Sequence, residues 1–156
     1  MNWLDYDTEN CSVRRTLDIV GERWTLLVLR EAFNGVRRFD QIRDHTGISD
    51  AVLSDRLRTL VDADILAAVP YKEAGRRTRN EYRLTARGLD LYPILVALLQ
   101  WGDRYVADAS GPALVLSHRG CGEELHAAVI CTAGHELASA HEGEARPGPG
   151  ARIAAP

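Results

Sequence analysis

The strongest constraint on the fold is a pair of helical segments separated by a glycine. Phe39 and Ile42 mark a short helix that is expected to end near Thr46-Gly47, and Ser49 can cap a second helix that runs to about Asp62. The second helix carries apolar side chains at helical spacing along one face, namely Val52, Leu53, Leu57, Leu60 and Val61. A short helix, a tight turn and an amphipathic helix are typical of a helix-turn-helix.

A basic hairpin is expected directly after these helices. The runs 65–71 and 81–84 are β-like, and residues 72–80 between them have the composition of a hairpin tip. Residues 72–87 contain six basic and two acidic side chains, which is a local charge of +4. A merely solvated charge run is the alternative. Arginines on an exposed loop beside such a helix suit phosphates and the minor groove of DNA.

Further helices are expected on both sides of this region. Ser12 is a candidate N-cap for a helix over residues 13–20, and a second helix, apolar on most faces and therefore buried, is expected to end near Asn34-Gly35. Thr85 can cap a long helix from residue 86 to about residue 109. This order predicts a mainly α fold with a β-hairpin wing, a winged helix-turn-helix, with a small strand-rich C-terminal extension.

Composition divides the chain of 156 residues into three parts. Residues 1–109 are expected to form the winged domain for DNA binding and dimerisation, residues 110–141 a small extension with strand-like stretches at 113–117 and 125–130, and residues 142–156 a disordered tail. The net charge of -3, taken alone, argues mildly against a nucleic-acid partner. The position of the charges matters more, and the basic hairpin reverses that argument.

The sequence predicts a cytoplasmic protein. No apolar run of about 18 residues is present, and the acidic N-terminus lacks the basic start and apolar stretch of a signal peptide. Three cysteines are too few for a disulfide scaffold, so reduced thiols are expected.

Candidate DNA contacts lie on both helices of the pair and on the hairpin tip. Asp50 and Asp55 would repel phosphates unless they accept from cytosine amino groups or hold an arginine in place. Arg56 lies at the edge of the apolar stripe, where it can reach a phosphate or pair with an acid. The predicted DNA-binding residues are Arg37, Arg38, Gln41, Ser49, Asp50, Ala51, Ser54, Arg56, Arg58, Lys72, Arg76, Arg77 and Arg79.

Spaced motifs occur in a fixed order over about residues 11–106. They are Cys11-Ser12-Val13, the run 17–30, Phe39-Asp40-Gln41-Ile42, Gly47-Ile48-Ser49, the run 52–57, the run 81–85 with Gly88, and Trp101-Gly102. The series resembles HxlR-type transcriptional regulators, bacterial winged helix-turn-helix proteins related to the MarR group. The resemblance implies a homodimer that binds DNA, responds to metabolic or reactive small molecules, and dimerises through the first and last core helices.

The long helix after the hairpin is consistent with a dimer. It has more apolar side chains than one small domain can bury, so a second chain is expected to cover them. The C-terminal extension is the alternative cover. An effector could be held near Trp24, Phe33, Tyr92 and Trp101, although all four can equally be plain core residues.

Cys11 is a sensor candidate by resemblance, because some HxlR-like proteins use a cysteine at this position to sense oxidants or electrophiles. A thiol at a helix N-terminus faces the positive end of the helix dipole. An inert cysteine packed at the dimer interface is the alternative.

The extension resembles a degenerate zinc-ribbon-like tail found on some HxlR-like proteins. His118, Cys121, Cys131 and His135 would supply two imidazoles and two thiolates, a set that tetrahedral zinc accepts. A metal-free hairpin is the alternative, and no cofactor is otherwise required.

The leading interpretation is a sequence-specific transcriptional regulator, a repressor that binds a pseudo-palindromic operator as a homodimer. The alternatives are a thiol-based redox or electrophile sensor that uses Cys11, and a winged-helix module that binds only protein, against which the basic hairpin argues. An enzyme is not expected, because no G-x-S-x-G, P-loop or H-E-x-x-H motif occurs.

Overall fold

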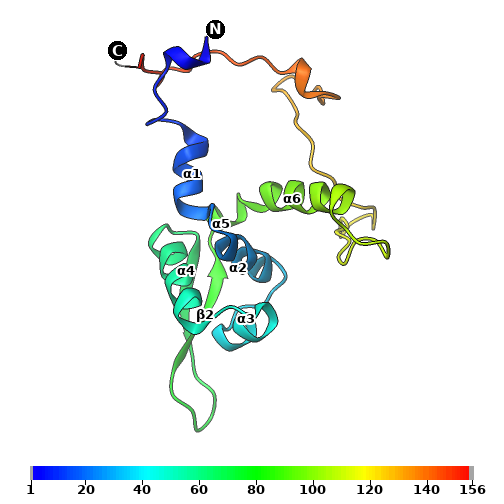
Figure 1. Cartoon of the computed structure of the whole chain (residues 1–156). Coiled ribbons are helices and arrows are strands. Elements are labelled where there is room, and N and C mark those ends of the chain that lie inside the picture. Colours follow the sequence, from blue (N-terminus) through cyan, green and yellow to red (C-terminus); the bar gives the residue numbers. More distant parts are fainter. Residues whose placement is uncertain (1, 155–156) are drawn as a thin grey trace. The chain divides into compact units, whose positions relative to one another are not determined.

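The computed structural model describes residues 2–154, which form two compact units (Figure 1). The first unit contains residues 2–92 together with residues 150–154, and the second contains residues 93–149. None of the described helices is long and apolar enough to cross a membrane.

The first unit begins with the helices α1 (Ser12–Val20) and α2 (Arg23–Phe33). Both lie where the sequence predicts them, but the N-cap of α1 is Cys11 and not Ser12. The Cys11 carbonyl already accepts a helical hydrogen bond from the Arg15 N–H at 3.0 Å, so Ser12 lies inside the helix. As expected for the central helix, α2 has several buried side chains, which are Thr25, Val28, Leu29 and Glu31.

The helices α3 (Phe39–Thr46) and α4 (Asp50–Asp62) form the predicted helix-turn-helix. The turn depends on Gly47, whose φ of 71° lies in the left-handed region that favours glycine. Ser49 then caps α4, because its Oγ accepts from the backbone N–H of Val52 at 3.4 Å. The helix pair buries five aliphatic side chains, which are Ile42, Ile48, Leu53, Leu57 and Leu60.

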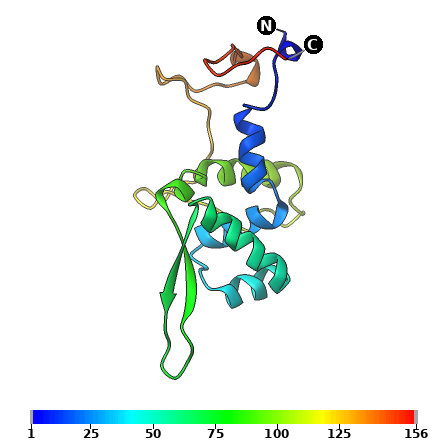
Figure 2. The same cartoon turned by 90° about the vertical axis from the view of Figure 1, so that its left-hand side faces the viewer.

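The wing is the antiparallel pair of β1 (Leu66–Tyr71) and β2 (Arg79–Leu84), and Figure 2 shows it projecting beyond the helices. Tyr71 pairs with Arg79, so the loop at the wing tip comprises residues 72–78 and is two residues shorter than predicted. The segment before α3 joins the outer edge of β2, where the Arg37 carbonyl accepts from the Tyr82 N–H at 2.8 Å. The prediction of a mainly α, winged helix-turn-helix fold is confirmed.

The prediction of one long helix over residues 86–109 is wrong, because the structure has two helices in this region. A short helix, α5 (Ala86–Leu89), is followed after two residues by α6 (Tyr92–Tyr105). Pro93 explains the break, since proline has no N–H to donate and its ring clashes with the carbonyl four residues earlier, here that of Leu89. Thr85 caps α5 as predicted, with its Oγ1 accepting from the Gly88 N–H at 3.0 Å.

The second unit consists of α6 and an extension that wraps against it. The Gln100 side chain holds the two together, donating to the Leu125 carbonyl at 2.8 Å and accepting from the Ala127 N–H at 2.7 Å. The segments 113–117 and 125–130 do not form regular strands. Their β-type pairing is limited to the isolated bridges Ser117–Glu124 and Ile130–Glu136, so the expectation of a strand-rich extension is corrected to turns and single bridges.

The two ends of the described chain pair with each other in the first unit. The Asp7 N–H donates to the Arg152 carbonyl at 3.0 Å, and the Ala154 N–H donates to the Asp5 carbonyl at 2.8 Å. Residues 152–154, which composition places in a disordered tail, therefore have backbone partners. The boundaries after residues 109 and 141 stay predictions.

Candidate nucleic-acid interface

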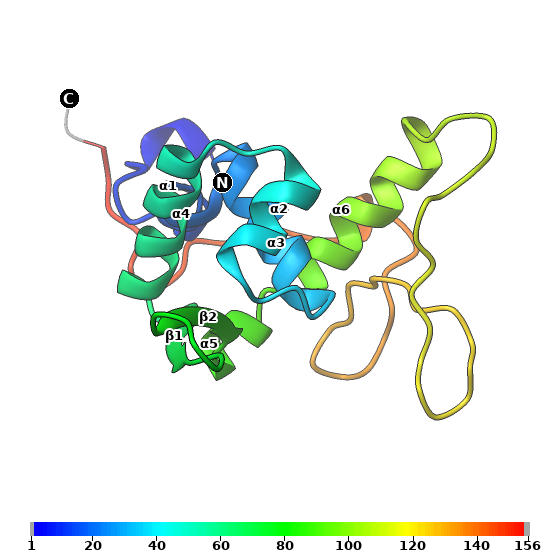
Figure 3. The same ribbon diagram turned by 90° about the horizontal axis from the view of Figure 1, so that it is seen from below.

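The outer surface of α4 presents small and polar side chains to solvent. Leu53, Leu57 and Leu60 form the buried stripe, and Asp50, Ala51, Ser54 and Arg58 are exposed. Val52 is 37% exposed and lies on this outer surface, which corrects its expected place among the buried residues. It precedes Leu53 by one residue, which is a rotation of about 100° away from the buried stripe. Seen from the wing tip, α3 and α4 lie side by side with the hairpin next to them (Figure 3).

Asp55 holds the two arginines of α4. It pairs with Arg56, and its Oδ1 lies 3.5 Å from Nη1 of Arg58. The side chain of Arg56 is only 23% exposed, so of the two roles predicted for it the structure shows the pair with an acid. Arg58 keeps 67% of its side chain exposed, so it is the more exposed of these two arginines.

The acidic start of α4 has its own cationic partner. Asp50 Oδ1 lies 3.5 Å from Nη1 of Arg43 on α3, and Arg43 also pairs with Asp44 at 2.8 Å. Asp50 therefore carries a partly neutralised charge, which reduces its repulsion of phosphates. Sequence reasoning missed Arg43, although its position seven residues before Asp50 across the Gly47 turn was a usable signal.

Arg38 fastens the wing to the start of α3. Its Nη1 donates to Oε1 of Glu73 at 2.7 Å, and its guanidinium carbon lies 4.4 Å from the ring centroid of Tyr71. A second link joins Arg79 of β2 to Asp40 of α3 at 3.5 Å. Of the other predicted residues before or on α3, Arg37 and Gln41 are exposed.

Several arginines of the hairpin form ion pairs with acidic side chains of the protein itself. Arg76 lies 3.7 Å from Glu73, and Arg83 lies 2.5 Å from Glu81. Arg87 belongs to α5 and not to the wing. Among residues 2–154, the basic side chains of the wing loop that have no ion-pair partner are Lys72 and Arg77. These two residues are the predicted wing contacts that offer a full charge to a phosphate.

A buried carboxylate ties α2 to α3 beneath this surface. The side chain of Glu31 is 1% exposed, and it accepts from Nε of Arg30 at 2.8 Å and lies 2.6 Å from Nδ1 of His45. Burial by itself raises the pKa of Glu31, but the hydrogen bonds with His45 and Arg30 outweigh it, so the pKa lies below its ordinary value. No sequence motif indicated this contact, because its partners are 14 residues apart.

The predicted sensor and metal residues belong neither to the helix-turn-helix nor to the wing. Cys11 is a half-buried free thiol at the start of α1. In the extension, Nδ1 of His118 lies 3.2 Å from Sγ of Cys121, and the backbone N–H of Cys131 donates to the His135 carbonyl at 2.9 Å. Among residues 2–154, the structure shows no group of three or more metal-ligating side chains close enough to share one ion. The zinc site stays a prediction, which elemental analysis of the purified protein tests.

The aromatic residues proposed for an effector site are divided between the two units. Phe33 and Tyr92 stack with their ring centroids 5.1 Å apart, and Trp24 lies 4.8 Å from the guanidinium carbon of Arg23. Trp101 belongs to the second unit and is 60% exposed. The stacked rings of Phe33 and Tyr92 are consistent with the alternative that these two residues are core residues.

The sequence is similar to known regulators over most of its length. Residues 19–110 match the family model described as HxlR-like helix-turn-helix. The chain is 47% identical over 147 residues to Rv3095 of Mycobacterium tuberculosis, named an uncharacterized HTH-type transcriptional regulator, and the match covers 94% of this chain and 92% of that protein. It is 32% identical over 106 residues to the regulator YdeP of Bacillus subtilis, covering 65% of this chain and 81% of that one.

Solved structures show the same fold. The crystal structure of PA1607 is 33% identical with a TM-score of 0.77, and the match covers 88% of this chain and 95% of that one. The redox regulator HypR in its oxidized form is 27% identical with a TM-score of 0.56, covering 63% of this chain and all of HypR (100%).

Proposed function

Because this chain belongs to the HxlR-like helix-turn-helix family of transcriptional regulators, we propose that it binds a pseudo-palindromic operator as a homodimer and represses the adjacent gene. The named relatives are transcriptional regulators, a class that normally has no catalytic activity. DNA as the partner supports a cytoplasmic location.

The observation that carries the proposal is that α4 and the wing both expose polar and basic side chains and are joined through α3. Arg58 and Ser54 are exposed on α4, and Lys72 and Arg77 are exposed on the wing loop. The ion pairs Arg38–Glu73 and Arg79–Asp40 join the wing to α3 and thus to the helix-turn-helix. Side chains on α4 can read base edges in the major groove, while unpaired cations on the wing contact phosphates and fix the register.

An uncovered apolar stripe supports the homodimer. On α6 the exposed side chains of Ile94, Leu98, Trp101 and Tyr105 follow the spacing i, i+4, i+7 and i+11, which places them on one face. The extension docks through Gln100, on a different face, so it leaves this stripe exposed. On α1, Val13 and Leu17 are exposed at a spacing of four residues. These two surfaces are the ones we assign to the second copy.

A binding assay with the DNA upstream of the protein's own gene tests the proposal. We expect saturable binding that weakens steeply with salt, and a Lys72→Ala, Arg77→Ala double variant whose salt slope is shallower by about two for each chain of the bound dimer. The matched control is Arg119→Ala with Arg146→Ala, which removes the same charge from exposed positions of the extension and tail. An equal change of the salt slope in both double variants would contradict the assignment of Lys72 and Arg77 to DNA.

A thiol-responsive regulator is a second candidate, favoured by the similarity to HypR and the place of Cys11 at the start of α1. In this case an oxidant or aldehyde releases the parent protein from DNA and leaves Cys11→Ser bound. Equal release of both proteins would exclude Cys11 as the sensor.

A further inference from the structure

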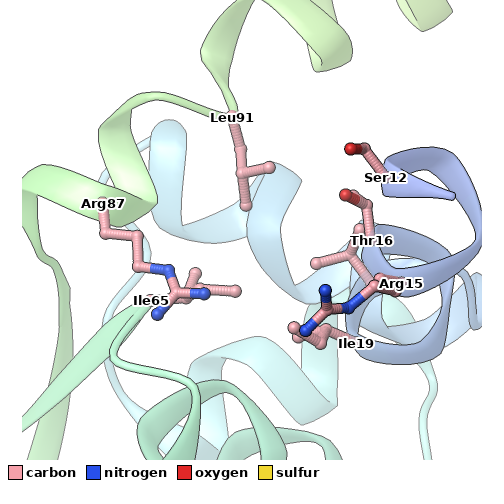
Figure 4. Close-up of a pocket in the computed structure, with 8 residues that line it drawn as sticks. Ser12, Arg15, Thr16, Ile19, Ile65, Arg87 and Leu91 are labelled. Carbon is pink, nitrogen blue, oxygen red and sulfur yellow. The ribbon is translucent and has the colours of Figure 1, made fainter. Parts of the chain in front are cut away.

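A pocket of about 400 Å³ opens beside α1 in the first unit, within the size range of small-molecule sites (Figure 4). Ser12, Arg15, Thr16 and Ile19 form one wall, since their spacing of i, i+3, i+4 and i+7 puts them on one helical face. The opposite wall contains Ile65, Arg87 and Leu91. Sequence reasoning missed this pocket, although the spacing of the α1 residues is visible in the chain.

Two arginines face each other across the pocket. Figure 4 shows that the side chains of Arg15, from α1, and Arg87, from α5, both project into the space between these helices. Nη1 of Arg15 donates to Oδ1 of Asn10 at 3.2 Å, which is a neutral partner. Within residues 2–154 no carboxylate pairs with either arginine. Two like charges on one cavity repel each other, and an anion between them removes that repulsion.

The remaining lining defines the class of anion. Ser12 and Thr16 add hydroxyl groups beside Arg15, while Ile19, Ile65 and Leu91 add apolar side chains to the two walls. A guanidinium group matches the two oxygens of a carboxylate, and the aliphatic side chains exclude water from an apolar body. We propose that this pocket binds a small organic carboxylate with an apolar body.

The pocket lies at the root of the wing. The Ile65 N–H donates to the Leu60 carbonyl of α4 at 2.9 Å, and the Ile65 carbonyl accepts from the Thr85 N–H at 3.1 Å. Ile65 therefore joins the end of α4 to the base of the hairpin. A ligand that packs against the Ile65 side chain contacts the residue that links these two elements. The regulatory consequence, a change in operator affinity, rests on the proposed function. The binding site itself does not.

Calorimetry with benzoate and hexanoate tests the site on the full chain without DNA. We expect saturable binding of both anions and at least roughly tenfold weaker binding of the neutral benzamide and hexanamide, because a charge-assisted hydrogen bond is lost. Arg15→Gln and Arg87→Gln should each lower the affinity for benzoate by at least about tenfold. Arg14→Gln, a neighbouring arginine on α1 that does not line the pocket, is the matched control and should bind as the parent does.

The outcomes separate the site from the function. Absence of carboxylate binding in protein that still binds operator overturns the site and leaves the regulator intact, and a second copy of the chain filling the pocket would give this result. Inorganic phosphate binding as tightly as benzoate overturns the apolar part of the proposal. Saturating benzoate should shift the operator affinity of the parent but not of Arg15→Gln, and an unchanged parent affinity overturns the regulatory consequence.

Discussion

Arg38, at the start of α3, donates a 2.7 Å hydrogen bond to Glu73 in the wing loop. Glu73 also lies 3.7 Å from Arg76, so one carboxylate restrains two of the arginines that the sequence assigns to DNA. Glu73 therefore neutralises part of the positive charge at the wing, and only the remaining part is available to DNA. Removal of this acid and removal of the free cations of the wing should have opposite effects on DNA binding.

Glu73→Gln should strengthen binding to non-specific DNA and make its salt dependence steeper by about one to two units of slope for each bound chain, because Arg38 and Arg76 become available to phosphates. Titrations of labelled duplex at several salt concentrations measure this change. Glu123→Gln, at an exposed position of the extension, makes the same change in net charge and is the control. A slope equal to that of the control would show that Glu73 does not restrain these arginines.

Arg58→Ala should weaken operator binding by about 1–3 kcal/mol and leave non-specific binding nearly unchanged, because base contacts carry discrimination between sequences. Its side chain is 67% exposed on α4, so folding should not suffer. Competition between operator and scrambled duplex measures the ratio. Equal loss on both duplexes would place Arg58 on the phosphate backbone.

Glu31→Gln should lower the free energy of unfolding by about 1–3 kcal/mol at neutral pH, because a buried hydrogen-bonded carboxylate is lost. The pKa of Glu31 is lower in the folded than in the unfolded chain, where it is near 4.5, so its contribution is complete above that pH and is lost as the pH falls through the folded pKa. Urea unfolding of the parent and the variant at pH 7 and in acid measures the difference, with Glu9→Gln as the exposed control. A gap between parent and variant that does not narrow in acid would contradict this account.

Gly88→Ala should destabilise the protein by at least about 1–3 kcal/mol, the cost of overpacking a closely packed site. A Cβ at residue 88 would lie 2.2 Å from the Ile65 carbonyl oxygen, which is backbone and cannot turn aside. Gly102→Ala is the control, since its Cβ would meet only Val106 at an ordinary 3.7 Å. Thermal unfolding measures both variants, and equal midpoints would show that α5 does not approach Ile65 this closely.

Cys131 should react with iodoacetamide faster than Cys121. The nearby backbone N–H groups of His135 and Ala133 stabilise its thiolate and hold the pKa of the Cys131 thiol below its ordinary value, so more thiolate is present near neutral pH. Peptide mass spectrometry over a pH series measures the rate at each residue. Equal rates at both cysteines would contradict the effect of the turn at residues 131–135.

The order of the elements could be predicted because its signals are local. Gly47, the cap at Ser49 and the β-like runs of the hairpin each act over a few residues, and the structure confirms them. Pro93 was an equally local signal for the break between α5 and α6, but the continuous apolar pattern around it indicated a single helix.

The pairing of charges could not be predicted in the same way. Arg38 and Glu73 are 35 residues apart, and Arg15 and Arg87 approach one pocket from different elements. Sequence reasoning therefore counted a local charge of +4 in the hairpin region and assigned Lys72, Arg76, Arg77 and Arg79 to DNA. In the structure Glu73, Glu81 and Asp40 pair with several of them, and Arg87 lies at the pocket.

Footprinting of the chain on the DNA upstream of its gene tests the central claim most directly. The account predicts two protected half-sites related by a dyad and spaced by about one helical turn, or about 10 base pairs, with two protein chains per operator. Protection of a single half-site by one chain, or uniform protection along the duplex, would contradict it.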